Sequence, residues 1–489
     1  MNLSFLDGIL KYVPGINKPT TPLSFREKLK WTAIIMGVYF LMFSTPAFGV
    51  STSTINQPLI QLISIIFASR IGSLITVGIG PIVLSSIVLQ LIMGAGLFDI
   101  DLNDPEQKGR FQSIQKLAAM AIAAVEAYIF VATGYVPLVS SAYVGIVVLQ
   151  LALSAIFIIF LDESMTKWGI TSGINLFIAG GVAYAIIAGT STILLGEAIQ
   201  AIQSGGATAI PNAILAFGPL FFAIIVFLVS IYAYDMKVEI PLVFSQLRGV
   251  GGRLPIPFLY VSVLPVILAT SFELSMTVWF RFLAGVTGTF ASLVKFIALY
   301  QATPTGTGAT QLNLVGGLIY LISPNFPLPY STAYGGIGGY SAYFSYLATG
   351  TSQLYLPWGG IVAVPEFIHI IIYTLVLVAL AVVFGRFWIE MTGQSPKHVA
   401  EQLQDVGWQV PGFRRDPRIV ESILNKYIPT ITVLGSVFVA LLAAVATLTG
   451  AVGTGMGILL TVGIMYMIYQ QLEQEHALDT YPQLNKLLS

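Results

Sequence analysis

Long apolar runs recur along the whole chain and constrain its fold more than any other feature. A helix needs about 20 mainly apolar residues to cross the hydrocarbon core of a bilayer. Ten stretches come close to this length, so the sequence predicts an integral membrane protein with ten spans. They are roughly 31–49, 74–96, 117–137, 143–161, 171–189, 212–234, 257–280, 361–384, 428–449 and 456–472.

The charge content supports the same class of protein. Only 9% of the 489 residues are charged, whereas a soluble domain usually carries about 25% charged residues. The mean hydropathy of +0.85 points the same way. The chain contains no cysteine, which excludes disulfides, thiolate metal sites and a cysteine nucleophile.

The cationic residues predict the orientation of the spans. If the N-terminus is cytoplasmic, 19 of the 22 Lys and Arg residues fall in cytoplasmic segments, and only Arg70, Arg281 and Lys295 fall elsewhere. Cytoplasmic loops of membrane proteins carry such an excess of Lys and Arg. We therefore expect a multi-pass protein of the plasma membrane with both termini in the cytoplasm.

The segments outside the spans have distinct compositions. Residues 3–13 place their leucines and isoleucines on one helical face, which predicts an amphipathic helix on the membrane surface. The outer segment 281–355 is rich in Gly, Tyr, Ser and Thr and indicates no clear fold. The expected segments are a cytoplasmic N-terminal segment 1–30, external loops 191–211 and 281–355, cytoplasmic loops 235–256 and 385–427, and a cytoplasmic tail 473–489.

One apolar stretch is too short to span the membrane. It covers about 55–68, and Arg70 interrupts it soon afterwards. This length is typical of a re-entrant or half-inserted helix. We therefore predict a re-entrant helix over 55–71.

The spans divide into two halves of five, 31–190 and 212–472. An odd number of spans in each half gives the halves opposite orientations, as in inverted repeats with a pathway between them. The predicted fold class is an all-α membrane protein with ten transmembrane helices in two inverted pseudo-symmetric halves and a re-entrant helix.

Signatures of catalysis are missing. The sequence has no phosphate-binding Gly-Lys loop and no H-E-x-x-H zinc motif. His369 is alone in its span, which is typical of a hydrogen-bond donor between packed helices. We therefore expect neither an enzyme nor a cofactor.

Two intramembrane acids are functional candidates by default, because charged groups are costly within a membrane. They are Glu126, midway along the third span, and Glu273, toward the outer part of the seventh, and a structural function is the other interpretation of both.

A glycine-rich run, TVGIGPIV at 76–83, is the most informative segment. Gly78, Gly80 and Pro81 permit a kink and close approach of the backbone. Ile79 and Val83 are four residues apart and share a helical face. The fifth span repeats this spacing with Ile174 and Ile178. Taken alone, such pairs are typical of packing or lipid-facing residues.

Six segments together resemble the SecY family, especially its archaeal and eukaryotic branch. They are TVGIGPIV (76–83), SGINLFI (172–178), VEIPL (238–242), YVSVLPVIL (260–268), GFRR (412–415) and GMGILLT (455–461). They cover nearly the whole chain in the order of the family. The resemblance implies the pore-forming subunit of the Sec protein translocase, which conducts unfolded secretory polypeptides and releases transmembrane segments sideways into lipid.

The resemblance also implies three sites within the membrane. A ring of aliphatic residues would form the constriction, and the re-entrant stretch would be the plug that seals it. A lateral gate would lie between the second and third spans and the seventh and eighth. The implied residues are Ile79, Val83, Ile174, Ile178, Ile267 and Leu460 for the ring, Gln61, Ile63, Ser64, Ile65, Phe67 and Arg70 for the plug, and Ser85, Ser86, Gln90, Glu126 and Ser275 for the gate.

Basic residues in two cytoplasmic loops would serve partners. Arg248, Arg253, Arg414 and Arg415 resemble the residues with which the family docks ribosomes, and cations suit the phosphates of ribosomal RNA. Control of topology alone is the other interpretation. The family further implies a heterotrimer with a SecE-type clamp subunit and a small beta subunit, and contacts with signal sequences, nascent polypeptides and membrane lipids.

Two other functions fit parts of the pattern. An ion-coupled secondary transporter could share the inverted-repeat plan, but it usually needs a midplane site lined by several charges or unwound backbone. An intramembrane hydrolase would need a paired catalytic constellation. Tyr234-Asp235 has no G-x-G-D partner in the sequence.

Overall fold

The coordinates are a computed structural model of the chain. They describe residues 14–21, 23–51, 63–94, 105–244, 251–261, 263–285, 290–304, 310–330, 332, 336–358, 360–405, 408–409 and 417–480. The predicted amphipathic helix at 3–13, the part of the predicted plug at 55–62, and the end of the tail at 481–489 lie outside the described residues.

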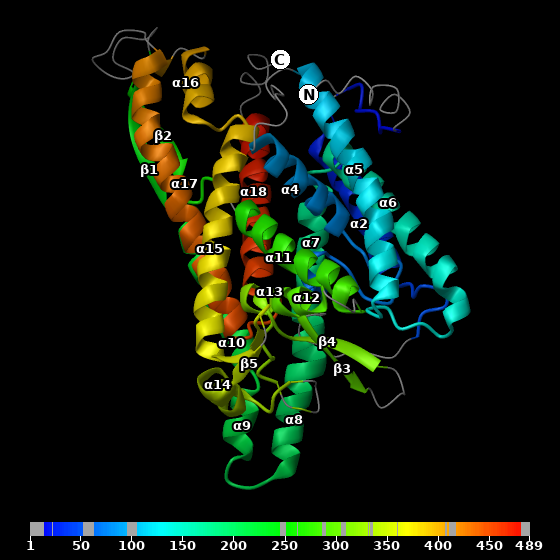
Figure 1. Cartoon of the computed structure of the whole chain (residues 1–489). Helices are drawn as coiled ribbons and strands as arrows, with labels where there is room; N and C mark the ends of the chain where they lie inside the picture. Colours follow the sequence, from blue (N-terminus) through cyan, green and yellow to red (C-terminus); the bar gives the residue numbers. More distant parts are fainter. Residues whose placement is uncertain are drawn as a thin grey trace.

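Long helices dominate the first half of the chain (Figure 1). Ser24 begins the first of them with a capping box: its hydroxyl accepts a bond from the Glu27 amide at 3.4 Å, and the Glu27 carboxylate accepts one from the Ser24 amide at 3.0 Å. The helices are α2 (Phe25–Ser44), α4 (Gly80–Gly94), α5 (Pro105–Ala132), α6 (Val144–Trp168) and α7 (Gly173–Ala188).

The second half forms a similar set of helices. Its long helices are α10 (Gly218–Asp235), α11 (Leu264–Phe282), α15 (Glu366–Met391), α17 (Pro417–Leu448) and α18 (Gly455–Thr480). α15 lies beside α17 in Figure 1 and packs against it and against α11. The halves meet where α4 packs on α11 and α7 packs on α18, so one apolar core contains residues from both.

Among the described residues, six helices are long and apolar enough to cross a membrane. They cover Gly109–Ala132, Ser141–Trp168, Gly173–Ser204, Ala209–Asp235, Glu366–Gln404 and Arg418–Leu448. Gly80–Met93 and Gly455–Gln470 are shorter apolar helices. The fold is therefore that of a mostly helical membrane protein.

The prediction of an all-α protein was wrong, because two β-sheets flank the helices. In the first, β1 (Lys237–Phe244) pairs antiparallel with β2 (Gly251–Pro257) and with β7 (Trp408–Gln409). Alternating apolar residues in β1, including the buried Ile240, favour this hairpin. The hairpin packs on α16 (Pro396–Asp405) and the neighbouring ends of α15 and α17, so the described parts of 235–256 and 385–427 are not open loops.

The second sheet lies within the outer segment 281–355, for which the sequence indicated no clear fold, and extends beyond it. Its strands in order are β3 (Leu299–Pro304), β4 (Thr310–Gly316), β5 (Thr351–Tyr355) and β6 (Ile361–Pro365), with only β4 and β5 parallel. Short helices α12 (Ala291–Ile297), α13 (Leu318–Ile322) and α14 (Tyr340–Thr349) accompany it. We name the region 290–365 the outer cap.

Helices also replace the loop expected at 191–211. α7 continues through a π-helical turn (Gly189–Leu194) into α8 (Leu195–Ser204), and α9 (Ala209–Leu215) leads into α10. Gly205 and Gly206, both with positive φ, form the turn between α8 and α9. Small alanines on the two helices allow their close packing.

Other boundaries also differ from the predictions. The helix expected over 361–384 begins at Glu366, because the β-branched run before it forms β6 and Pro365 is the N-cap of the helix. The helix expected over 74–96 begins only at Gly80. In the described part of the predicted plug, 63–71, the backbone is helical only over 63–66.

A buried polar network joins the outer cap to the start of α15. The Glu366 carboxylate accepts a bond from the Tyr320 hydroxyl at 3.0 Å, and its other oxygen lies 3.0 Å from His369 Nδ1. His369 Nε2 lies 3.0 Å from the Ser323 carbonyl oxygen. Burial raises the pKa of Tyr320, which therefore stays protonated and able to donate. The lone intramembrane histidine thus joins helices and cap through hydrogen bonds.

We predict that Glu366→Ala destabilises the protein by about 2 kcal/mol, because it leaves Tyr320 and His369 buried without their partner. Thermal unfolding of the purified protein in detergent measures this as a lower midpoint. Glu390→Ala on the exposed side of the same helix is the control. Equal midpoints for the two variants would contradict the prediction.

Candidate functional site

The six residues expected to form a ring come from both halves and lie in one apolar cluster. Ile79 precedes Val83 on or next to α4, Ile174 and Ile178 lie on α7, Ile267 lies on α11 and Leu460 on α18. Ile174 is half-buried and the other five are at most 5% exposed. The structure therefore brings these residues into a single core, and their function as a constriction stays a prediction.

The segment expected to be the plug folds back on this cluster. The Phe67 carbonyl oxygen accepts a hydrogen bond from the Ile79 amide at 2.8 Å. Gly78 permits this contact, because it has φ +61° and a Cβ there would lie 2.0 Å from the Phe67 oxygen. The end of this segment is thus bonded to the first predicted ring residue.

Tyr39 on α2 holds the same segment from another side. Its hydroxyl donates to the Ala68 carbonyl oxygen at 2.8 Å, and its ring stacks on Phe177 of α7 at 4.7 Å. Ala68 has φ +47°, a left-handed conformation that is rare for alanine. The sequence analysis missed Tyr39, because no motif links a tyrosine to a carbonyl 29 residues later.

The other predicted plug residues differ in how far they are buried. Ile63 and Phe67 are buried, and Ser64 and Ile65 are half-buried. Arg70 is exposed, with its guanidinium 5.7 Å from the centroid of the Phe43 ring. Gln61 lies outside the described residues.

The five residues expected at the lateral gate lie on three helices that pack together, α4, α5 and α11. Ser85 donates to the Ile82 carbonyl oxygen at 2.8 Å, and Gln90 Nε2 donates to Ser86 Oγ at 3.1 Å. Three buried atoms have no hydrogen-bond partner among the described residues: Gln90 Oε1, Glu126 Oε2 and Ser275 Oγ. Unpaired buried polar atoms cost free energy, so this seam is less stable than an apolar one.

Two further residues of α11 belong to the same group and were missed. Ser271 Oγ is buried without a partner among the described residues, and the buried Trp279 Nε1 lies near the Glu126 carboxylate. They lie four residues on either side of Ser275, on the same helical face. This spacing was readable from the sequence, but the burial was not.

The two intramembrane glutamates lie in different surroundings. A Cβ at Gly80 would be 3.0 Å from Glu126 Oε2, so Glu126 reaches the beginning of α4. Glu273 was expected toward the outer interface, but it is fully buried. Within the described ranges, no three His, Cys, Asp or Glu residues are grouped as a metal site requires.

Only one of the four arginines expected to bind partners is described. Arg253 lies exposed on β2, and its guanidinium pairs with the Glu239 carboxylate of β1 at 2.5 Å. Arg248, Arg414 and Arg415 lie outside the described residues.

Asp162, near the end of α6, positions the helix that carries Ile174 and Ile178. Its Oδ1 accepts bonds from the Ile174 amide at 2.8 Å and the Ser172 hydroxyl at 3.3 Å. It thus caps the start of α7 from a neighbouring helix. A Cβ on Gly173 would lie 2.6 Å from the Asp162 Cα, so a glycine is needed for this approach.

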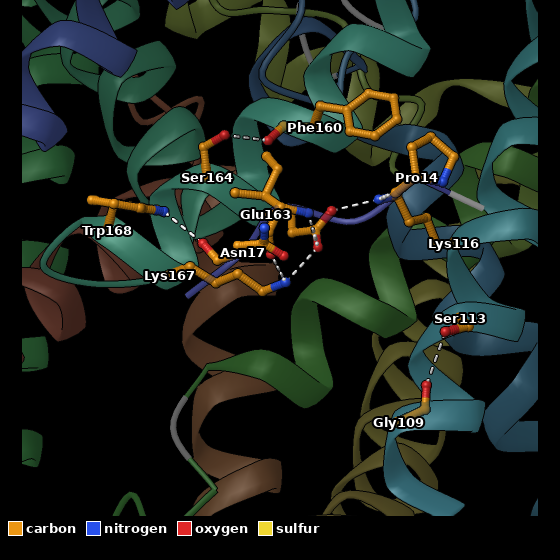
Figure 2. Close-up of polar contacts among 11 residues, drawn as sticks. Pro14, Asn17, Gly109, Ser113, Lys116, Phe160, Glu163, Ser164, Lys167 and Trp168 are labelled. Carbon is orange, nitrogen blue, oxygen red and sulfur yellow. Dashed lines mark hydrogen bonds and ion pairs between the residues drawn. The ribbon is translucent and has the colours of Figure 1, made fainter. Parts of the chain in front are cut away.

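The next residue, Glu163, holds the N-terminal segment (Figure 2). Its carboxylate pairs with Lys116 of α5 at 2.5 Å and Lys167 at 2.6 Å, and accepts the Ile16 amide at 3.0 Å. The two lysines also donate to the carbonyl oxygens of Pro14 and Ile16. The adjacent acids on α6 therefore bond to different segments: Asp162 to the start of α7, and Glu163 to the N-terminal segment.

Fold and site together define a multi-span helical membrane protein whose two halves meet at an apolar centre, as channels and transporters do. The SecY family matches residues 73–469. The Protein translocase subunit SecY of Methanocaldococcus jannaschii is 35% identical over 484 residues, with 98% of each chain covered. That of Pyrococcus horikoshii is 33% identical, with 98% and 97% covered. The chain belongs to the SecY family.

Solved structures agree with this assignment. One described as "The structure of a protein conducting channel" has a TM-score of 0.76 and 34% identity, with 98% of both chains covered. Another, "Sec61 in the Canine ribosome-channel complex from the endoplasmic reticulum", has a TM-score of 0.74 at 34% identity and the same coverage.

We predict that Gly78→Ala destabilises the closed arrangement by about 1–3 kcal/mol, because the added methyl group meets the Phe67 oxygen and the left-handed φ disfavours alanine. In planar bilayers the resting ion current should rise several-fold. Gly393→Ala shares a positive φ (+69°) but has no atom within 4 Å of its Cβ, so it controls for backbone strain. Identical currents in both variants would contradict the prediction.

We predict that Asp162→Ala also raises the resting ion current, because the loss of the cap costs about 1 kcal/mol and frees the Ile174 amide. Asp162→Asn keeps an acceptor oxygen and should preserve the low current. Glu163→Gln, which acts on the N-terminal segment, is the neighbouring control. A current that rises equally for Glu163→Gln and Asp162→Ala would refute a specific action on α7.

Proposed function

We propose that this chain is the pore-forming subunit of a Sec protein translocase. It conducts unfolded secretory polypeptides across the membrane and releases transmembrane segments laterally into lipid. Family membership over most of the chain supports this function, as does the likeness to a protein-conducting channel. The observation that carries it is the apolar cluster between the halves, with the segment 63–79 folded onto it.

The aliphatic cluster suits a channel that must pass many sequences without leaking ions. Branched aliphatic side chains offer an ion no replacement for its hydration shell, and a narrow apolar neck tends to exclude water. They also make no directional bonds, so the ring can adapt to any polypeptide. Ile79, Val83, Ile174, Ile178, Ile267 and Leu460 form this ring in our proposal, and the segment around Ile63–Arg70 is the plug.

The seam between α4, α5 and α11 is the proposed lateral gate, together with α15. Its buried unpaired polar atoms lower the cost of separating the helices, since water or a polar backbone can then satisfy them. An apolar segment that enters the seam meets a surface less apolar than lipid and moves on into the bilayer.

The proposed topology has ten spans in two inverted halves with both termini in the cytoplasm. Helices α2 and α11, of 20 and 19 residues, and the shorter apolar helices α4 and α18 would join the six that already have the required length and hydropathy. The distribution of Lys and Arg supports this orientation in a plasma membrane.

The proposed partners are a SecE-type clamp subunit, a small beta subunit and the ribosome. A relative in structure was solved in a ribosome-channel complex, which supports the last of these. In this proposal Arg253, exposed on the β1–β2 hairpin, contacts phosphates of ribosomal RNA, and Arg248, Arg414 and Arg415 are the other contacts.

The absence of native cysteine permits a direct test. One cysteine is placed at Ile79 or at Leu460 in the channel reconstituted with its partner subunits. A ribosome stalled on a secretory chain with one mid-segment cysteine then engages it, and the sample is oxidised. We expect disulfides at both positions because the polypeptide passes through the ring.

A cysteine at Leu153, which is 57% exposed on α6, is the control and should give no disulfide. Absence of disulfides at Ile79 and Leu460, with the ribosome demonstrably bound, would refute the proposed path.

A further inference from the structure

Arg281, at the outer end of α11, is buried in an unusual environment. It is 3% exposed, and its guanidinium carbon lies 3.8 Å from the centroid of the Tyr135 ring. Tyr135 is 1% exposed and follows α5 in the first half of the chain. This cation–π contact therefore joins the two halves, and the proposed function assigns it no part.

Tyr135 is the principal partner of this buried cation, which lies over its ring and also interacts with its hydroxyl. The ion pairs found among the described residues join other side chains, and none of them reaches Arg281. Its Nε has no hydrogen-bond partner there either. A guanidinium held over an aromatic face is stabilised most when water is excluded, because water competes for the cation.

Neighbouring contacts place the pair at the outer end of the proposed lateral gate. Tyr128 of α5 meets Phe282 of α11 edge-on, with ring centroids 6.1 Å apart. The Tyr300 hydroxyl of β3 donates to the Thr277 carbonyl oxygen of α11 at 2.5 Å. The helices α5 and α11 thus meet through aromatic rings just where Arg281 bridges them, and the outer cap is bonded to the same helix.

We propose that Arg281 and Tyr135 form a latch that keeps the outer end of the seam between α5 and α11 closed. When the two helices separate at the seam, the guanidinium leaves the ring and becomes hydrated. The cation–π contact and its stabilisation of the closed seam are then lost together. Arg281 is then a specificity-determining residue. The apolar segment that opens the gate must supply the free energy that breaks the latch, and weaker segments remain in the pore. This inference rests on the proposed function.

The test uses the channel with its partner subunits and a cysteine pair at Tyr128 and Phe282, joined by a short thiol-reactive crosslinker. Arg281→Met removes the cation and keeps much of the side-chain length, and Tyr135→Leu removes the ring. We expect each to lower the crosslinked fraction of the resting channel, with a shift of about tenfold in the open-to-closed ratio, or about 1.4 kcal/mol. Segments of lower hydrophobicity should then integrate into lipid.

Three controls separate a latch from general packing. Tyr135→Phe keeps the ring and loses only the hydroxyl, so it should retain most of the closed fraction that Tyr135→Leu loses. Lys295→Met removes the cation from the more distant Lys295–Tyr355 pair of the outer cap, at 5.8 Å, and should have no effect. The double variant Arg281→Met/Tyr135→Leu should be no more open than either single variant, because both remove the same contact.

The proposal is overturned if the two single effects add, if Arg281→Met leaves crosslinking and integration unchanged, or if Lys295→Met has the same effect. If Arg281→Met does not accumulate, Tyr135→Leu compared with Tyr135→Phe tests the contact from the other half. Crosslinking of the resting seam needs no translocating polypeptide. Failure of the disulfides at Ile79 and Leu460 would therefore refute the conduit without affecting this result.

Discussion

The backbone hydrogen bond between the Phe67 carbonyl and the Ile79 amide is the constraint on which the rest of the centre depends. It joins two residues that lie 12 positions apart in sequence and connects the proposed plug to the first residue of the proposed ring. Only glycine fits at position 78, because any Cβ would overlap the Phe67 oxygen. A shift of this segment would therefore move the amide of Ile79, so the proposed plug and the proposed ring would move together.

The position of the proposed ring also depends on contacts made elsewhere in the fold. Asp162 fixes the start of α7 from the end of α6, and the stacked pair Tyr39 and Phe177 fixes α7 against α2. Contacts between aliphatic side chains have little directional preference. Hydrogen bonds and stacked rings are directional, so they fix the orientation of one helix relative to another. These polar and aromatic contacts hold the helices in place, so the ring itself can remain purely apolar.

Much of the membrane-embedded part could be predicted from the sequence, because a bilayer requires long apolar runs. The glycines and the proline of the run at 76–83 also predict a kink there. The residues expected in the ring do lie in one core. The strands of 237–257 and 299–365 and the helical turn at 189–215 were missed, since short elements outside lipid have weak local patterns. The pairs Tyr39–Ala68, Asp162–Ile174 and Tyr135–Arg281 join distant or unrelated segments, and only the folded chain reveals them.

The contacts of the proposed plug are divided unequally between the halves. Its described hydrogen bonds to other segments come from the first half, from Tyr39, from Ile79 and from the turn at 73–76. Toward the second half the plug makes an apolar approach, where a Cβ on Gly457 of α18 would lie 3.4 Å from Ile65. Separation of the halves at the seam breaks no described plug hydrogen bond. We infer that the gate can open while the plug stays with the first half, and that displacement of the plug needs the separate loss of the Phe67–Ile79 bond.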